Sequence, residues 1–177
     1  MFIGNDLMFF SQENLRTFSR NGASRIVISQ NEKEIYGDLK GLSLMKIWTV
    51  KEAAYKYFCK CGFHIPFCPA DFHVVSDNEF DSGKVLYEGL CCDFETVTGE
   101  DYIHSVCFEK LSSYCYFIIN KDENPQYIIN EKLNLDYTEI VKDEFGIPHL
   151  KHNSGYDYDI SKSGDNGFVS YALISGL

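Results

Sequence analysis

The sequence has no apolar run of the roughly eighteen residues that a membrane-spanning helix needs, no internal repeat and no low-complexity segment. Its first residues also lack the charged stretch followed by an apolar stretch that marks a secretory signal. We therefore expect a cytoplasmic protein that binds no membrane.

Cysteine is present, but its pattern excludes two common uses. Seven is an odd number, which does not fit a framework of paired disulfides. Cys59 and Cys61 are separated by one residue and Cys91 and Cys92 are adjacent, so neither pair has the spacing of a zinc site. We expect all seven to be reduced thiols, as in a cytoplasm.

Positive charge is scarce, with 16 Lys and Arg against 26 Asp and Glu and a net charge of −10. Sequence-independent binding to nucleic acid needs Lys and Arg against the phosphates, so we expect no nucleic-acid partner. Residues 1–62 nevertheless carry nine basic and six acidic residues, a net charge of +3, which leaves −13 for the remainder. This region could receive a small acidic partner, although an ordinary uneven distribution of surface charge explains the same count.

With 45% apolar and 15% aromatic residues, the 177 residues are expected to fold as one domain, residues 1–177. N-cap signals at Ser11 and Ser29 predict two short helices in the N-terminal part. Residues 63–140 form a β-rich middle section, residues 149–159 are expected to be a loop, and a final strand follows. The fold class is therefore α+β, a mostly antiparallel sheet with a central amphipathic helix and short N-terminal helices. The strands are expected at residues 1–7, 72–75, 84–87, 102–108, 114–119, 137–142 and 168–174.

The central helix is predicted over residues 42–60, where apolar residues recur at steps of three, four and seven. Thr49, Glu52 and Lys56 fall on another stripe of this helix, so a carboxylate and an ammonium project side by side. Such a pair could hold a metal ion and a phosphate together. It is also the commonest stabilising pair of solvated helices, so the stripe alone leaves both interpretations open.

Four segments together carry a resemblance to a known family. Residues 48–56, WTVKEAAYK, are preceded by Gly4-Asn5-Asp6 and followed by Gly146-Ile147-Pro148-His149-Leu150 and Ile160-Ser161-Lys162-Ser163-Gly164. Their content and order resemble the 4′-phosphopantetheinyl transferase superfamily, in the order of its short, holo-[acyl-carrier-protein]-synthase-like branch.

The resemblance implies an enzyme that transfers 4′-phosphopantetheine from coenzyme A to a serine of an acyl or peptidyl carrier protein, in fatty acid or polyketide biosynthesis. It implies Mg²⁺ bound by Asp6 and Glu52, with Glu52 and Lys56 as catalytic residues. The general base is either Glu52 or a metal-bound water. Further implied contacts are Lys51, Lys56, Ser161, Lys162 and Ser163 for coenzyme A, and Arg16, Arg20 and Arg25 for the carrier protein.

The chain departs from the family at three positions. Met8 and Phe9 stand where relatives often have a second acid, and Lys162 stands where the family has a histidine. A lysine can supply the same positive charge on a longer stem. The alternative is a catalytically weak relative that binds carrier protein or nucleotide without transfer, and a structural oligomer using the aromatic middle is a third possibility.

One copy of each motif also has a consequence for assembly. In short-branch relatives the serine motif of one subunit, which corresponds to residues 160–164 here, meets the metal motif of another. The metal motif corresponds to Gly4-Asn5-Asp6 and the Lys-Glu segment of the central helix. Because this sequence shows no internal repeat, we expect a homo-oligomer, with a monomer carrying an unusual middle insertion as the alternative.

Overall fold

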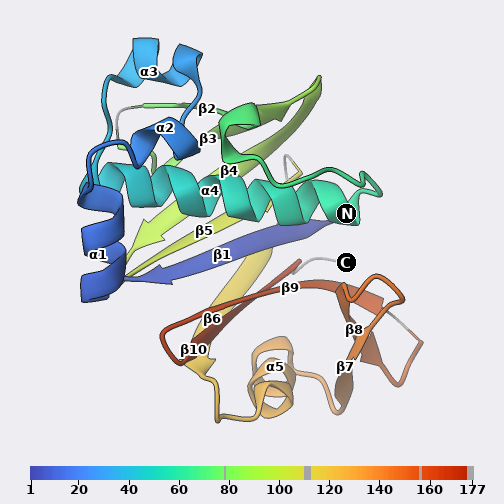
Figure 1. Cartoon of the computed structure of the whole chain (residues 1–177). Helices are drawn as coiled ribbons and strands as arrows, with labels where there is room; N and C mark the ends of the chain where they lie inside the picture. Colours follow the sequence, from blue (N-terminus) through green and yellow to red (C-terminus); the bar gives the residue numbers. More distant parts are fainter. Residues whose placement is uncertain (78, 110–112, 156, 175–177) are drawn as a thin grey trace.

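Two antiparallel five-stranded sheets, each with a helix on one face, make up the computed structural model of the chain (Figure 1). The structure describes residues 1–77, 79–109, 113–155 and 157–174. The N-terminal sheet carries the long central helix, and the C-terminal sheet carries a short one.

The first unit runs from the N-terminus to the end of the fifth strand. Its sheet has the order β1-β5-β4-β3-β2, so the first and last strands of the unit are neighbours. Its elements are β1 (Ile3–Phe9), α1 (Gln12–Ser19), α2 (Ser24–Val27), α3 (Gln30–Tyr36), α4 (Gly41–Lys60), the 3₁₀ turn η1 (Pro69–Asp71), β2 (His73–Ser76), β3 (Ser82–Tyr87), β4 (Leu90–Thr98) and β5 (Tyr102–Phe108).

The second unit repeats this topology with a shorter helical part. Its sheet has the order β6-β10-β9-β8-β7, which again places the first and last strands side by side. Both units therefore consist of one strand, a helical connection and four further strands. Its elements are β6 (Tyr114–Asn120), α5 (Pro125–Leu133), β7 (Thr138–Lys142), β8 (Pro148–His152), β9 (Asp157–Asp165) and β10 (Phe168–Ile174).

This duplication corrects the expectation that the chain has no internal repeat. The repeat lies in the order and pairing of the strands, while the helical connections differ: α4 has 20 residues and α5 has nine. No periodic residue pattern accompanies it, because the two units bury different side chains around helices of different length. A fold built from two such units can form a site between them without a second chain.

Helix α4 packs directly on strand β1, and a glycine makes this contact possible. A Cβ atom added at Gly4 would lie 2.1 Å from the carbonyl oxygen of Ala53 and 2.6 Å from the amide nitrogen of Tyr57. Any side chain would push the strand away from the helix. Glycine at this position therefore lets Asp6, two residues later, approach the face of α4.

The free edge of β1 is satisfied by side chains of β9. The backbone N–H groups of Ile3, Asn5, Leu7 and Phe9 each donate to a side-chain oxygen of β9, at distances from 2.6 to 3.3 Å. The β9 acceptors are, in the same order, Asp159, Ser161, Ser163 and Asp165. Apolar residues of both units also pack together in one cluster.

The fold class is confirmed, and several elements lie where the sequence predicts them. Ser11 caps α1 by accepting from the Asn14 amide, and Ser29 with Glu32 forms the capping box of α3. The central helix and the final strand β10 are also confirmed. The β-rich middle section holds β2 to β6 and, in addition, the short helix α5.

The expectation of a loop over residues 149–159 is wrong. Apart from residue 156, which lies outside the described residues, this segment contains most of β8 and the start of β9. The helices α2 and α5 and the strand β4 were also not expected. The polar residues of β9 contact β1 instead of water, so a polar sequence here does not indicate a loop.

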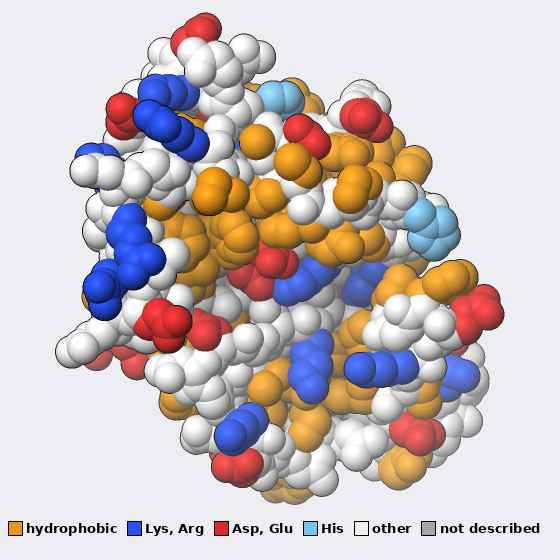
Figure 2. Space-filling model, in the orientation of Figure 1, with side chains coloured by type: hydrophobic (Ala, Val, Ile, Leu, Met, Phe, Trp, Pro, Cys, Tyr) orange, Lys and Arg blue, Asp and Glu red, His pale blue; other side chains and the backbone are white. Residues whose placement is uncertain are grey.

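All seven cysteines are free thiols. None of the helices in the described ranges combines the length and apolar character needed to span a membrane. Figure 2 shows Lys and Arg side chains, with an acidic group beside them, along the boundary between the upper and lower parts of the molecule. This boundary is where the two units meet and where the candidate site lies.

Candidate active site

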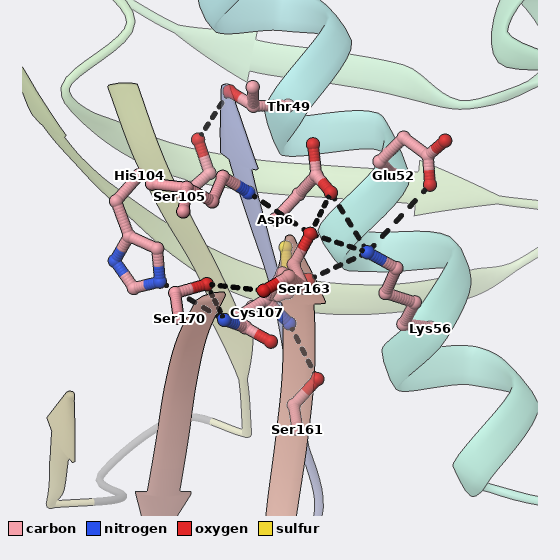
Figure 3. Close-up of polar contacts among 12 residues, drawn as sticks. Asp6, Thr49, Glu52, Lys56, His104, Ser105, Cys107, Ser161, Ser163 and Ser170 are labelled. Atoms are coloured by element: carbon pink, nitrogen blue, oxygen red, sulfur yellow. Dashed lines mark hydrogen bonds and ion pairs between the residues drawn. The ribbon is translucent and has the colours of Figure 1, made fainter. Parts of the chain in front are cut away.

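Asp6 of β1 and Glu52 and Lys56 of α4 converge at one place (Figure 3). The Lys56 ammonium lies 2.8 Å from Asp6 Oδ1 and 4.0 Å from Glu52 Oε2. Two carboxylates from different elements therefore share one cation. Three residues predicted as site residues from two separate motifs meet as expected.

Burial and the charges of this group change the pKa of the Glu52 carboxyl. Its partial burial raises its pKa, the nearby Asp6 carboxylate raises it further, and Lys56 opposes the shift. A glutamate in this setting holds a proton more tightly than one in water. It is therefore a better proton acceptor at a pH where it is ionised.

Lys56 also donates hydrogen bonds to residues of both units at the site. Its three ammonium hydrogens are directed at Asp6 Oδ1, the Asn5 carbonyl oxygen at 3.1 Å and Ser163 Oγ at 3.2 Å. The Ser163 hydroxyl in turn donates to Asp6 Oδ1 at 2.7 Å. Ser163 of the second unit thus reaches Asp6 and Lys56 of the first unit within a single chain.

A cavity of about 420 Å³ opens beside this group, between α4 and the second unit. Lys162, exposed on β9, lines it, and its ammonium lies 5.7 Å from the centre of the Tyr171 ring. Within the described part of the chain, Lys162 has no carboxylate partner. The other lining residues are Tyr55, Lys56, Cys59, Lys60, His64, Phe145, Gly146, Ile147, Pro148 and Ser161.

Lys60 lies at this cavity but is already engaged. Its ammonium contacts both carboxylate oxygens of Asp159, at 3.0 and 3.1 Å, and the Ile160 carbonyl oxygen at 2.7 Å. Its side chain is 4% exposed. Lys162 is therefore the better candidate to meet a phosphate in this cavity.

Lys51 does not join the group, and the structure does not support its predicted contact with coenzyme A. Its side chain is fully buried, and its ammonium donates to Glu32 Oε2 at 2.6 Å and to the Val27 carbonyl oxygen at 2.8 Å. Burial lowers the pKa of Lys51, and the Glu32 carboxylate opposes this shift. Lys51 instead ties α4 to α3 and to the end of α2.

The three arginines predicted to dock a carrier protein lie away from this cavity. Arg20 and Arg25 line a largely apolar cavity of about 780 Å³ together with Trp48 of α4 and Phe18 of α1. Arg16 lies on α1 beside a smaller hollow. The basic N-terminal region thus frames an apolar surface.

Several residues of the site were not predicted. His64 and Phe145 form an aromatic pair at the cavity, with ring centres 5.5 Å apart, and Asp159 and Asp165 fix β9 against β1. The aspartates have a sequence signal, because polar residues alternate from 159 to 165 with the period of a strand. No local signal distinguishes His64 or Phe145.

A family model described as the 4′-phosphopantetheinyl transferase superfamily matches residues 2–113. The chain belongs to this superfamily. Comparison with curated proteins and with solved structures found no match. The superfamily transfers 4′-phosphopantetheine from coenzyme A, so the protein is identified as a transferase of this kind. The match contains Asp6, Glu52 and Lys56 and ends before the second unit.

The donor set of this transferase fits a magnesium ion. Mg²⁺ binds proteins through one or two carboxylates and keeps waters or substrate oxygens as its other ligands. Asp6 and Glu52 supply two carboxylates, close enough for one to raise the pKa of the other. Met8 and Phe9 are buried in the core and add none. Across the described ranges, no cluster of three or more His, Cys, Asp or Glu could hold a metal by itself.

Proposed function

We propose that the protein transfers 4′-phosphopantetheine from coenzyme A to a serine hydroxyl of an acyl or peptidyl carrier protein, in a Mg²⁺-dependent reaction that releases adenosine 3′,5′-bisphosphate. The observation that carries this proposal is the meeting of Asp6, Glu52 and Lys56 beside a cavity that also presents Lys162. We place the protein in the cytoplasm.

Asp6 and Glu52 would hold Mg²⁺, which supplies neutralisation of the coenzyme A pyrophosphate when it is bound. Phosphoryl transfer of this kind depends mainly on positioning and on charge stabilisation. Lys56, one turn after Glu52, contacts the phosphates and stabilises the negative charge on the leaving group. Glu52 would take the proton of the attacking serine, with a metal-bound water as the alternative base.

Coenzyme A would occupy the cavity between α4 and the second unit. Lys162 contacts its phosphate as a point charge, in the place where the family has a histidine. Ser161 also lines this cavity, although its hydroxyl already accepts from the Asn5 amide at 3.0 Å. The turn from Gly146 to Pro148 forms the opposite wall.

The carrier protein would dock on the basic N-terminal region. Arg16, Arg20 and Arg25 surround an apolar surface, and carrier proteins are small and acidic as a class. Opposite charges across such a surface speed association and orient the partner. This arrangement would bring the carrier serine toward the end of α1 and the face of α4.

We propose that one chain holds one complete site, in which the two units act as one domain. The serine motif reaches Asp6 and Lys56 of the same chain, so self-association is not needed to unite the motifs. Mixing the Lys56→Met and Lys162→Ala variants, each of which should transfer poorly alone, tests this. Recovered transfer would mean that sites are shared between subunits.

A test of the function uses an apo carrier protein incubated with coenzyme A and Mg²⁺. Mass spectrometry should show one added phosphopantetheine with the wild-type protein and none with Glu52→Gln, which keeps the size of the side chain without its charge. If no apo carrier protein gains this mass, the proposal is wrong.

A second candidate function is that of a relative that binds carrier protein without transfer. It is favoured because Asp6 and Glu52 are the two carboxylates that the site offers to a metal, while Met8 and Phe9 stand where relatives often have another acid. Calorimetry separates the two functions. A pure binding protein should bind its carrier equally well with and without Mg²⁺ and coenzyme A, whereas the enzyme should need both to form its productive complex.

A further inference from the structure

The hydroxyl of Ser163 has no hydrogen-bonding capacity left for a substrate. A serine hydroxyl offers one donor and two acceptor sites. Ser163 donates to Asp6 Oδ1 and accepts from Lys56 Nζ and from the Leu7 amide, at 2.7, 3.2 and 3.3 Å. The residue is 8% exposed. A coenzyme A phosphate could reach this oxygen only after one of these contacts breaks.

The same contacts fix the orientation of the Asp6 carboxylate. Its Oδ1 accepts from both Ser163 and Lys56, and no described residue donates to Oδ2 (Figure 3). Rotation of the carboxylate would break two charge-assisted hydrogen bonds at once. Oδ2 is therefore held in one direction, with Glu52 of α4 as the other carboxylate of the site.

The position of Ser163 is set by the register of β9 against β1. Asp159 and Asp165 hold the two ends of this contact through the amides of Ile3 and Phe9, at 2.6 and 2.7 Å. Because side chains of a strand alternate between faces, Ser161 and Ser163 both point toward β1. Of these two serines, Ser163 donates to Asp6, while the Ser161 hydroxyl has one hydrogen bond among the described residues, which it accepts from the Asn5 amide.

We infer that Ser163 is a positioning residue, which orients the Asp6 carboxylate for a divalent cation, and is not a contact for coenzyme A. The inference rests on the proposed function and adds a role for the second unit. In addition to lining the cavity proposed for coenzyme A, that unit sets the geometry of the proposed cation-binding carboxylate on the first unit. Groups that hydrogen-bond to metal ligands control metal affinity in this way.

Binding of Mn²⁺, used as a paramagnetic substitute for Mg²⁺, tests this without any turnover. Counting free Mn²⁺ by electron paramagnetic resonance should show that Ser163→Ala binds about ten- to a hundredfold more weakly than wild type. Ser163→Thr keeps the hydroxyl and should restore most of the affinity. Ser161→Ala is the matched control, because it removes a hydroxyl from the same row without touching Asp6, and it should bind Mn²⁺ as wild type does.

The second measurement is coenzyme A binding in the absence of divalent cation, followed by calorimetry. Ser163→Ala should bind coenzyme A as tightly as wild type. A clear loss of this affinity would identify Ser163 as a contact for coenzyme A and overturn the inference. Unchanged Mn²⁺ affinity in Ser163→Ala would overturn it as well.

Two outcomes separate this inference from the proposed function. If wild type transfers phosphopantetheine but Ser163→Ala keeps full Mn²⁺ affinity, only the role of Ser163 is wrong. If wild type neither binds Mn²⁺ nor transfers, both are wrong. Should Ser163→Ala not fold, Ser163→Cys keeps a side chain of similar shape with a weaker donor and carries the same expectation.

Discussion

The ammonium of Lys56 donates to Oδ1 of Asp6 across 2.8 Å, so a cation of the central helix and a carboxylate of the first strand neutralise each other. Their side chains are 28% and 10% exposed. Removing one member of such a partly buried pair leaves the other charge without its partner. A metal bound at Asp6, as proposed, would therefore share its ligand with this ammonium.

The first prediction follows from this shared position. Lys56→Met should lower the transfer rate by about a hundred- to a thousandfold, because a cation at the leaving group is lost. Its Mn²⁺ affinity should not fall, since a competing positive charge is removed from Asp6. Single-turnover mass spectrometry and Mn²⁺ titration measure the two effects.

Lys46→Met is the control for this variant. Lys46 also lies on α4 and pairs with a carboxylate, that of Asp81, but it is not part of the site. It should keep the wild-type transfer rate. A Lys56→Met protein that transfers as fast as Lys46→Met would remove Lys56 from the mechanism.

The sequence predicted the centre of the site because the signals there are local. A period of 3.6 residues places Glu52 and Lys56 on one stripe, and the motif order adds Asp6 from the first strand. Helical periodicity does not show which element of the fold packs against each face of the helix. Lys51 adjoins Glu52 in the sequence, yet it points to Glu32 of α3 and is fully buried.

The strand β9 was missed for a different reason, although its polar residues alternate from 159 to 165 with the period of a strand. Its polar side chains at 159, 161, 163 and 165 satisfy the edge of β1, a role that only the folded structure shows. The helix α5 did carry signals, since Asn124 caps it, Pro125 begins it and Asn134 ends it in the left-handed conformation. The duplicated topology leaves no trace in residue spacing.

The second prediction concerns the buried pair of Lys51 and Glu32. Their side chains are 0% and 2% exposed, so Lys51→Met leaves a buried carboxylate without its cation. Its free energy of unfolding should fall by about 3–5 kcal/mol. Urea denaturation measures this loss, with Lys33→Met as the control.

Lys33 pairs with Asp38 on the surface, and its loss should cost at most about 1 kcal/mol. The folded fraction of Lys51→Met should still bind coenzyme A normally. Equal losses of stability in the two variants would contradict the structural role of Lys51, and weaker coenzyme A binding in folded Lys51→Met would restore the prediction from the family motif.

The third prediction is a dependence of stability on pH that comes from His104. Burial lowers the pKa of His104 to about 3, and its Nε2 lies 3.1 Å from Asn5 Nδ2. In the unfolded chain this histidine binds a proton below a pH of about 6.5. In the folded protein the same histidine stays neutral at these pH values until the pH approaches its lowered pKa. Stability is therefore full above that pH and is lost as the pH falls toward the folded pKa.

At pH 5 the cost should be about 2 kcal/mol relative to pH 7.5. His104→Gln keeps a polar partner for Asn5 without a titrating group, so its unfolding free energy should fall less over this interval. Urea denaturation at the two pH values gives the comparison. Equal falls in both proteins would show that the titration lies elsewhere.

The last prediction concerns Lys162, where the chain departs from the family histidine. Lys162 is exposed at the cavity between α4 and the second unit and has no carboxylate partner in the described part of the chain, so its charge is available to a phosphate. Lys162→Ala should weaken coenzyme A binding by about 1.5–3 kcal/mol, or roughly ten- to a hundredfold. Lys151→Ala is the matched control, because Lys151 is exposed on the neighbouring strand β8 and does not line the cavity.

The pH dependence of binding then distinguishes lysine from histidine chemistry at this position. Lysine stays charged well above neutral pH, whereas histidine loses its charge near a pH of about 6.5. Wild-type binding should therefore lack a fall between about pH 6 and 8, and Lys162→His should introduce one, because coenzyme A then loses a cationic contact as the pH rises. Calorimetric titration across this range measures both. If Lys162→Ala binds coenzyme A as tightly as Lys151→Ala, the cavity is not the donor site in the way proposed, and the binding protein without transfer becomes the better description of this chain.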